Sequence, residues 1–246
     1  QIELAEQRMN FVSSISHELK TPLTSILMYS EMLKSGMVQD PKIQLEYHEF
    51  IYGESGRLSR LISNILKLSN LNRQQEMVNV EYVNILSLTD TIQSKVSSLI
   101  EKNGFKINFS IDNSINNVDM LVDLDAFAQI VINLVDNSVK FFNAAKIDDV
   151  HRKAIDIRFC LHKKLNNKLL FSVRDYGPGI SNAEHEKIFE LFYREGNELT
   201  RTTPGTGIGL ALVYELVSAQ GGKIKVNKQS QGVEFELLFD CRHSIL

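Results

Sequence analysis

The sequence predicts an α+β protein in two parts, a helical hairpin over residues 1–77 and an α/β sandwich over residues 78–246. In the first part, apolar residues recur at alternating spacings of three and four, which is the pattern of a helical seam. In the second part, segments of alternating polarity that are typical of strands lie between amphipathic helical segments. A chain of 246 residues with 43% apolar residues is also long enough to bury a core.

Composition and charge exclude several classes of protein. The net charge is −3 and the basic residues are spread through both halves, so we expect no nucleic-acid partner. No run approaches the roughly 18 to 20 apolar residues of a membrane helix, and we expect no membrane contact by this segment. Cys160 and Cys241 lie far apart without a CxxC or Cys/His group, which argues against a disulfide framework or a zinc site. The chain starts on a helical pattern without Met, so we expect a segment of a longer protein.

Two long helices form the predicted hairpin. Gly36 marks the break between them, and Asp40 followed by Pro41 is a typical N-cap and first-turn pair. Two helices of this length cannot bury their apolar faces against each other alone, so we predict a homodimer whose hairpins form a four-helix bundle. The seam residues are Val12, Ile15, Leu19, Pro22, Ile26, Tyr29 and Leu33 in the first helix and Tyr47, Ile51, Glu54, Leu58, Leu61, Ile65 and Leu68 in the second.

The first helix carries a polar group directly before a proline, in the stretch "FVSSISHELKTPLTSI". Helical geometry turns His17 away from the seam, with Thr21 one turn later on the same face and Glu18 as its neighbour. Because Pro22 removes a helical hydrogen bond, we expect the turn from His17 to Thr21 to be bent or loosened, which would expose a reactive side chain. An ordinary solvated histidine is the alternative interpretation.

The second part begins with a predicted strand over 79–86, a helix over 87–104 that Gly104 ends, and a strand over 105–112. A helix over 124–142 then carries a polar stripe at spacings of four, four and three. Asparagine is a poor helix former, so two of them one turn apart indicate that their amide oxygens coordinate something. Hydrogen bonds to nearby loops are the alternative. The stripe consists of Gln129, Asn133, Asn137 and Lys140.

Two glycine-containing segments follow. A β-hairpin that turns at Asn166 and Asn167 is predicted to end at Asp175, where the next glycines allow the backbone to approach a nucleotide base. The stretch "TRTTPGTGIGLALVYELVSAQGG" is a glycine-rich loop that opens into a helix, whose free N–H groups can face phosphate. It matches neither a P-loop nor a dinucleotide-binding fingerprint.

In order, "SISHELKTPL", "NLVDNSVKF", "DYGPGI", "IFELFYR" and "GTGIGLAL" resemble the H, N, G1, F and G2 boxes of sensor histidine kinases. The resemblance extends from Gln1 to Phe239. It implies that the first 77 residues are a dimerisation and histidine-phosphotransfer hairpin. It also implies that the rest is the ATP-binding α/β sandwich of the gyrase, chaperone and MutL superfamily, the Bergerat type of fold.

The resemblance also implies roles for individual residues. His17 would be the phosphoacceptor, with Glu18 orienting its ring and Thr21 aligning water for a phosphatase reaction. ATP and Mg²⁺ would be bound, the partner would be a response regulator receiver domain, and the chain would be a cytoplasmic segment of a membrane-anchored sensor. The implied ligands of metal and triphosphate are Asn133 and Asn137, the base acceptor is Asp175, and the other nucleotide contacts are Lys140, Gly177, Gly179, Arg194, Gly205, Thr206, Gly207, Gly209 and Leu210.

Two alternatives remain beside autophosphorylation of His17 and phosphotransfer to an aspartate. An ATP-hydrolysing conformational machine of the same superfamily uses a glutamate where this chain has Asn133, so its hydrolytic base is missing. A phosphatase-dominant signalling scaffold would be favoured by loss of Asp175 or of the G2 glycines, and both are present. Relative to the family pattern, residues 144–153 are a modest insertion.

Overall fold

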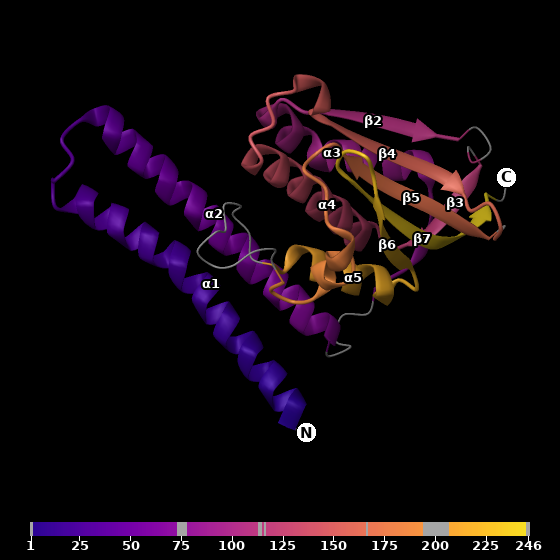
Figure 1. The fold of residues 1–246 in the computed structure, drawn as a ribbon, viewed down its shortest axis with the longest axis horizontal. Coiled ribbons are helices and arrows are strands. Elements are labelled where there is room, and N and C mark those ends of the chain that lie inside the picture. The colour runs from indigo at the N-terminus through magenta and orange to yellow at the C-terminus, as the bar shows by residue number, and fades with distance from the viewer. Residues whose placement is uncertain are drawn as a thin grey trace. The chain divides into compact units, whose positions relative to one another are not determined.

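The computed structural model describes residues 2–72, 78–112, 115, 117–165, 167–193 and 207–244. The chain divides into two compact units, Gln1–Ser69 and Asn70–Leu246, and Figure 1 shows a helical hairpin in the first and a sheet with helices in the second. The division lies a few residues before the boundary at 77/78 that the sequence pattern suggests.

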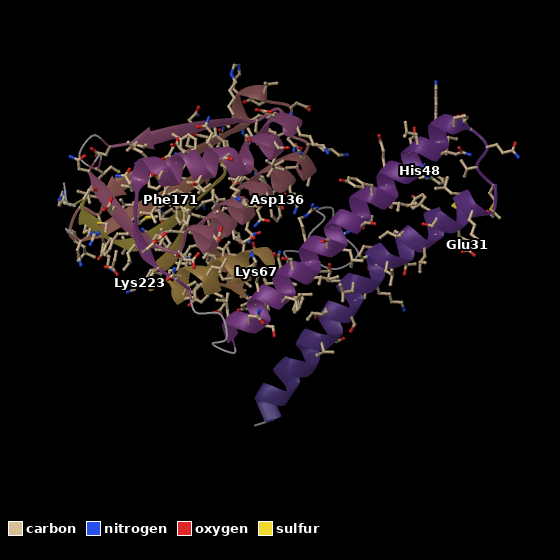
Figure 2. All side chains as sticks on the ribbon, turned by 180° about the vertical axis from the view of Figure 1, so that it is seen from behind. Glu31, His48, Lys67, Asp136, Phe171 and Lys223 are labelled. Carbon is tan, nitrogen blue, oxygen red and sulfur yellow. The ribbon has the colours of Figure 1, made fainter. Side chains whose placement is uncertain are left out.

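The first unit is the predicted pair of long helices, α1 (Ile2–Lys34) and α2 (Pro41–Asn72). Gly36 adopts a φ of +69° after the end of α1, and the Asp40 carboxylate accepts a hydrogen bond from the backbone N–H of Lys42 at 2.8 Å. The ring of Tyr29 packs on Tyr47 and Phe50, with centroid distances of 4.7 and 4.3 Å. The two helices therefore contact each other near the turn, at the end of the hairpin where Figure 2 labels Glu31 and His48.

Pro22 lies inside α1, which continues through it to Lys34, and the expected bending or loosening of the turn before it stays a prediction. Proline leaves the carbonyl of the residue four positions earlier without its backbone donor. Here Pro22 is buried, and two hydroxyls bond to carbonyls of this segment, Thr21 Oγ1 to His17 O at 3.2 Å and Ser25 Oγ to Thr21 O at 3.2 Å. The helix thus continues through the proline with its polar side chains bonded to the backbone.

The second unit contains one mixed sheet. In the described part of the chain the strand order is β1-β3-β7-β5-β4-β2, and β6 pairs with β7. Neighbours are antiparallel except β2 and β4, which are parallel. The strands are β1 (Glu81–Asn84), β2 (Lys106–Ile111), β3 (Val118–Val122), β4 (Ala154–Leu161), β5 (Lys168–Asp175), β6 (Lys223–Lys228) and β7 (Val233–His243).

Helices α3 (Ile85–Asn103), α4 (Leu124–Ala144) and α5 (Gly209–Ala219) cover one face of this sheet (Figure 1). Aromatic rings join the two layers: Phe127 of α4 lies 4.9 Å from the ring of Phe171 on β5, which Figure 2 labels inside the sandwich, and 5.8 Å from that of Phe239 on β7. The fold is therefore the predicted α+β arrangement of a helical hairpin followed by a sandwich. Short 3₁₀ turns in the described part of the chain include η2 (Val150–Arg152), η3 (Asn182–Glu184) and η4 (Lys187–Phe189).

Most predicted elements are present with shifted ends. The first strand covers only Glu81–Asn84, because the Asn84 side chain accepts from Leu86 N and caps α3 two residues before the expected start. Gly104, with a φ of +67°, ends α3 as expected. The β4–β5 hairpin ends at Asp175 as predicted, whereas Asn166 of its expected turn lies outside the described residues.

Candidate functional site

His17 and Thr21 lie on the exposed surface of α1. The Thr21 hydroxyl donates to the carbonyl of His17, one turn earlier, at 3.2 Å. A hydroxyl that donates its proton in this way still has lone pairs with which to accept a hydrogen bond from water. The helix therefore presents an imidazole and an oriented hydroxyl side by side, as the heptad pattern predicts.

Glu18 belongs to a charged group that bridges the two helices of the hairpin. Its carboxylate lies 3.9 Å from Arg57 Nη2 on α2, and Arg57 Nη1 lies 3.5 Å from the Glu54 carboxylate. The three side chains are 16–28% exposed, so their attraction is less screened than that of a fully solvated pair. Glu54, which interrupts the apolar seam in the sequence, is thereby explained as a partner of Arg57. No sequence pattern singled out Arg57 beyond its place in the predicted helix.

The polar stripe of α4 forms as predicted. Gln129 Nε2 donates to Asn133 Oδ1 at 3.5 Å, while Asn133 Nδ2 is buried without a hydrogen-bond partner among the described residues. Buried amides normally have partners, so this orphaned group marks a place where a ligand is expected. Lys140 forms an ion pair with Asp136, which Figure 2 labels on the same helix, so a contact of Lys140 with phosphate would compete with this pair.

Asp175 ends β5 next to α4. Its Oδ1 accepts from the backbone N–H groups of Gly177 at 2.9 Å and Val233 at 3.3 Å, and its Oδ2 lies 3.2 Å from the Ser138 hydroxyl. Burial raises the pKa of this carboxyl above its ordinary value, and the three hydrogen bonds oppose that rise. Since the Ser138 hydroxyl also lies 3.0 Å from the carbonyl of Leu134, Oδ2 is the less committed oxygen of Asp175.

Gly232 is a residue that the sequence reasoning missed. It precedes β7 with a φ of +74°, and a Cβ built on it would lie 1.9 Å from the carbonyl oxygen of Asp175. Gly179, with a φ of +83°, faces the same turn, since its Cβ would lie 3.0 Å from Gly232 O. The turn between β6 and β7 therefore packs closely against the backbone of Asp175 and the segment after it. A glycine directly before a strand was the available signal, but its contact with Asp175 depends on strand pairing across the sheet.

The N-terminus of α5 lies beside the polar stripe of α4. A Cβ on Gly209, the first residue of α5, would lie 3.9 Å from Asn137 Nδ2. Leu210 is in the first turn of α5, whose leading N–H groups have no acceptor within the helix. Gly207, with a φ of +67°, packs against the backbone of Phe192 and accepts from its N–H at 3.0 Å. Arg194, Gly205 and Thr206 lie outside the described residues.

The donor set fits a nucleotide better than a metal held by protein alone. Within the ranges that the structure describes, no three His, Cys, Asp or Glu side chains gather as a metal site. Two asparagines beside a helix N-terminus instead suit an ion that takes most of its oxygen ligands from phosphate and water, as Mg²⁺ does. None of the described helices combines the length and apolar character of a membrane span.

The fold and the site define a chain that joins a hairpin carrying an exposed histidine to an ATPase-like sandwich. The family model for histidine kinase-, DNA gyrase B- and HSP90-like ATPases matches residues 122–243. The family model for the His Kinase A (phospho-acceptor) domain matches residues 7–74. The chain therefore belongs to the sensor histidine kinases and contains the two domains of their catalytic core.

Similar proteins agree with this family. Sensor protein kinase WalK of Staphylococcus saprophyticus is 29% identical over 242 residues, which are 98% of this chain and 38% of that protein. A WalK of Staphylococcus aureus is 28% identical over 98% of this chain and 55% of its own length. The chain thus spans only part of these relatives.

Solved structures share the fold. Histidine kinase AdeS of Acinetobacter baumannii has a TM-score of 0.69 and 18% identity, over 91% of this chain and 97% of that chain. Histidine kinase ThkA in complex with response regulator protein TrrA has a TM-score of 0.67 and 22% identity, over 96% and 63%. Full-length ShkA in complex with AMPPNP has a TM-score of 0.64 and 23% identity, over 96% and 47%.

Proposed function

We propose that this chain transfers the γ-phosphoryl group of ATP to His17 and then to an aspartate in the receiver domain of a response regulator. The observation that carries the proposal is the presence of two complementary parts in one chain. One is an exposed histidine followed by a carboxylate on a phosphoacceptor-type hairpin, and the other is the corner of the sandwich where Asp175, the α4 asparagines and the N-terminus of α5 meet.

In this proposal the corner binds both ends of ATP, the adenine base and the triphosphate. Asp175 Oδ2 accepts from the amino group of adenine, and Gly177 and Gly179 let the base approach the backbone. Asn133 and Asn137 hold the triphosphate together with Mg²⁺, which would supply positive charge to offset that of the phosphates. The leading N–H groups of α5, which have no acceptor within the helix, face the phosphates, where the helix dipole also favours negative charge.

At His17 the reaction is a substitution at phosphorus. The unprotonated ring nitrogen attacks the γ-phosphorus, the new N–P bond forms, and the bond to the β–γ bridging oxygen breaks to release ADP. The proton on the other ring nitrogen passes to Glu18, which leaves a phosphohistidine whose ring is neutral and whose phosphoryl group carries the negative charge. The ion pair with Arg57 holds the Glu18 carboxylate at a defined place on the hairpin during this step.

A receiver domain suits this chemistry, because a phosphoramidate is a reactive donor for a carboxylate. The ThkA neighbour, whose structure is a complex with a response regulator, supports the same partner here. Membrane anchoring of the whole protein and a cytoplasmic place for this segment are part of the proposal, by analogy with sensor kinases.

Unpaired apolar side chains on the hairpin support the proposed homodimer. Leu23 and Leu27, one turn apart on α1, are 48% and 60% exposed, and Ile62 and Leu66 on α2 are 44% and 59% exposed. A surface of this kind on a helical hairpin is usually covered by a further helix pair. A second copy would complete a four-helix bundle.

A phosphatase activity toward the same regulator is the second proposed function. It is favoured by Thr21, whose hydroxyl is fixed by its bond to His17 O and can accept from a water that attacks phospho-aspartate.

The central test is autophosphorylation with γ-³²P-ATP. The wild-type chain should acquire an acid-labile label, and His17→Gln should acquire none while its ATP affinity, measured by calorimetry, stays within about twofold, since the acceptor and the nucleotide site are on different domains. Full labelling of His17→Gln would refute the assignment of the acceptor. Release of phosphate by wild type without any labelled protein would favour the ATP-hydrolysing machine instead.

A further inference from the structure

Arg152 forms hydrogen bonds to backbone carbonyls that no sequence motif predicts. It ends η2, in the segment that connects α4 to β4. Its Nε donates to the carbonyl of Tyr176 and its Nη2 donates to the carbonyl of Gly177, both at 2.9 Å. One guanidinium group thus binds two successive carbonyls of the turn that follows Asp175.

These carbonyls lie where the sheet no longer provides donors. The ladder between β4 and β5 ends at the pair of Ile155 and Asp175, so the backbone beyond Asp175 leaves the sheet. Carbonyls in a partly buried turn need donors of their own. The two N–H groups on one edge of an arginine are spaced for two neighbouring acceptors, and a charged donor gives stronger hydrogen bonds than a neutral one.

The contact to Tyr176 reaches Asp175 through a single peptide group. The peptide between Tyr176 and Gly177 has its carbonyl bound to Arg152, and its N–H donates to Asp175 Oδ1 at 2.9 Å. Binding at the carbonyl fixes the plane of this peptide and strengthens the hydrogen bond made by its N–H. The orientation of the Asp175 carboxylate therefore depends on the Arg152 guanidinium, to which it is linked by two successive hydrogen bonds through this peptide.

We propose that Arg152 is a positioning residue for nucleotide selection: by holding the Tyr176–Gly177 peptide, it aims Asp175 Oδ2 at the amino group of adenine. This inference rests on the proposed function, in which Asp175 recognises the base. Lysine cannot replace the arginine, because an ammonium group is a point donor and cannot bind both carbonyls with a planar fork.

The test compares ATP with ITP, which carries a 6-oxo group in place of the amino group. Calorimetry on the full chain gives the affinities of both nucleotides for wild type, Arg152→Ala, Arg152→Lys, Asp175→Asn and Arg158→Ala. Arg158 is the matched control, because it is a half-exposed arginine on β4 that lies 4.0 Å from Glu234 and does not contact the turn. A role in folding alone would lower the active fraction for both nucleotides equally, whereas a role in aiming Asp175 changes the ratio of the two affinities.

We expect Arg152→Ala and Arg152→Lys to weaken ATP binding about tenfold and to weaken ITP binding much less, with Arg158→Ala unchanged. If Arg152→Lys has the ATP affinity of wild type and the same ratio of ATP to ITP affinity, the inference is overturned. This result decides the question even if Arg152→Ala does not fold. Equal losses for ATP and ITP would overturn it as well. If Asp175→Asn leaves the ratio of ATP to ITP affinity unchanged, the proposed base recognition itself is wrong. If the ratio changes in Asp175→Asn but not in the Arg152 variants, only the role assigned to Arg152 is refuted.

Discussion

Asp175→Asn should separate nucleotide binding from stability. Asparagine has the same shape, and its Oδ1 can still accept from Gly177 N and Val233 N. Its Nδ2 can donate to the Ser138 oxygen while that hydroxyl donates to the carbonyl of Leu134, at the 3.0 Å distance already present. The variant therefore keeps every hydrogen bond of the free protein and loses a buried charge.

The same change should damage ATP binding, because an NH₂ group then faces the amino group of adenine where an acceptor stood. An unmatched buried polar group costs ~1–3 kcal/mol, which corresponds to a roughly 5- to 150-fold loss of affinity. Calorimetric titration with ATP measures this loss directly. An affinity for ATP equal to that of wild type would refute the assignment of Asp175 to the base.

The pH dependence of stability provides the second part of the test. Since the folded-state pKa of Asp175 is raised, its contribution to stability is fully present below the ordinary carboxyl pKa and is lost as the pH rises through the raised value. In the absence of nucleotide, wild type should therefore lose stability relative to Asp175→Asn as the pH rises through this window. Urea unfolding followed by circular dichroism at several pH values gives the difference. A variant that is less stable than wild type at neutral pH would show that the carboxylate stabilises the free fold.

Two further predictions concern the helix face at His17 and the turn before β7. Thr21→Ala should slow dephosphorylation of the partner regulator by at least about tenfold and affect autophosphorylation much less. Glu18→Ala should instead damage autophosphorylation. Equal losses in both reactions for Thr21→Ala would indicate a structural role beside Pro22. Gly232→Ala should lower the free energy of unfolding by at least ~2 kcal/mol, since its Cβ would lie 1.9 Å from Asp175 O at a positive φ. Gly53→Ala is the matched control, because this helical glycine has no neighbouring atom within 4 Å of the added Cβ. Its substitution should raise the free energy of unfolding by roughly 0.5–1 kcal/mol. Equal urea midpoints for the two variants would contradict the close approach at Gly232.

The parts of the fold that local pattern determines could be predicted from the sequence. The hairpin, the cap at Asp40, the end of α3 at Gly104 and the end of β5 at Asp175 all follow from spacing, capping and turn chemistry. These features depend on residues within one or two turns of each other. The polar stripe of α4 is predictable for the same reason, because helical periodicity alone brings its members to one face.

The supports of the candidate site could not be predicted, because they depend on pairing between distant segments. Val233 reaches Asp175 only through the register of β5 with β7, and Arg152 reaches Tyr176 from a connection without a regular pattern. Arg57 reads as an ordinary charged helix residue until α1 and α2 pack together. The burial of Pro22 could not be predicted either, because it depends on packing and not on the local pattern of α1.

The close approach of Gly232 to Asp175 limits how this protein can vary in length. Surface turns between adjacent strands generally tolerate insertions and deletions. The turn over residues 229–232 is different, because its last residue is packed against the backbone at the end of another strand. One residue added or removed there would shift Val233 in register and withdraw its N–H from Asp175. Among natural variants of this chain, the number of residues in this turn should therefore be more constant than its composition, apart from the glycine itself.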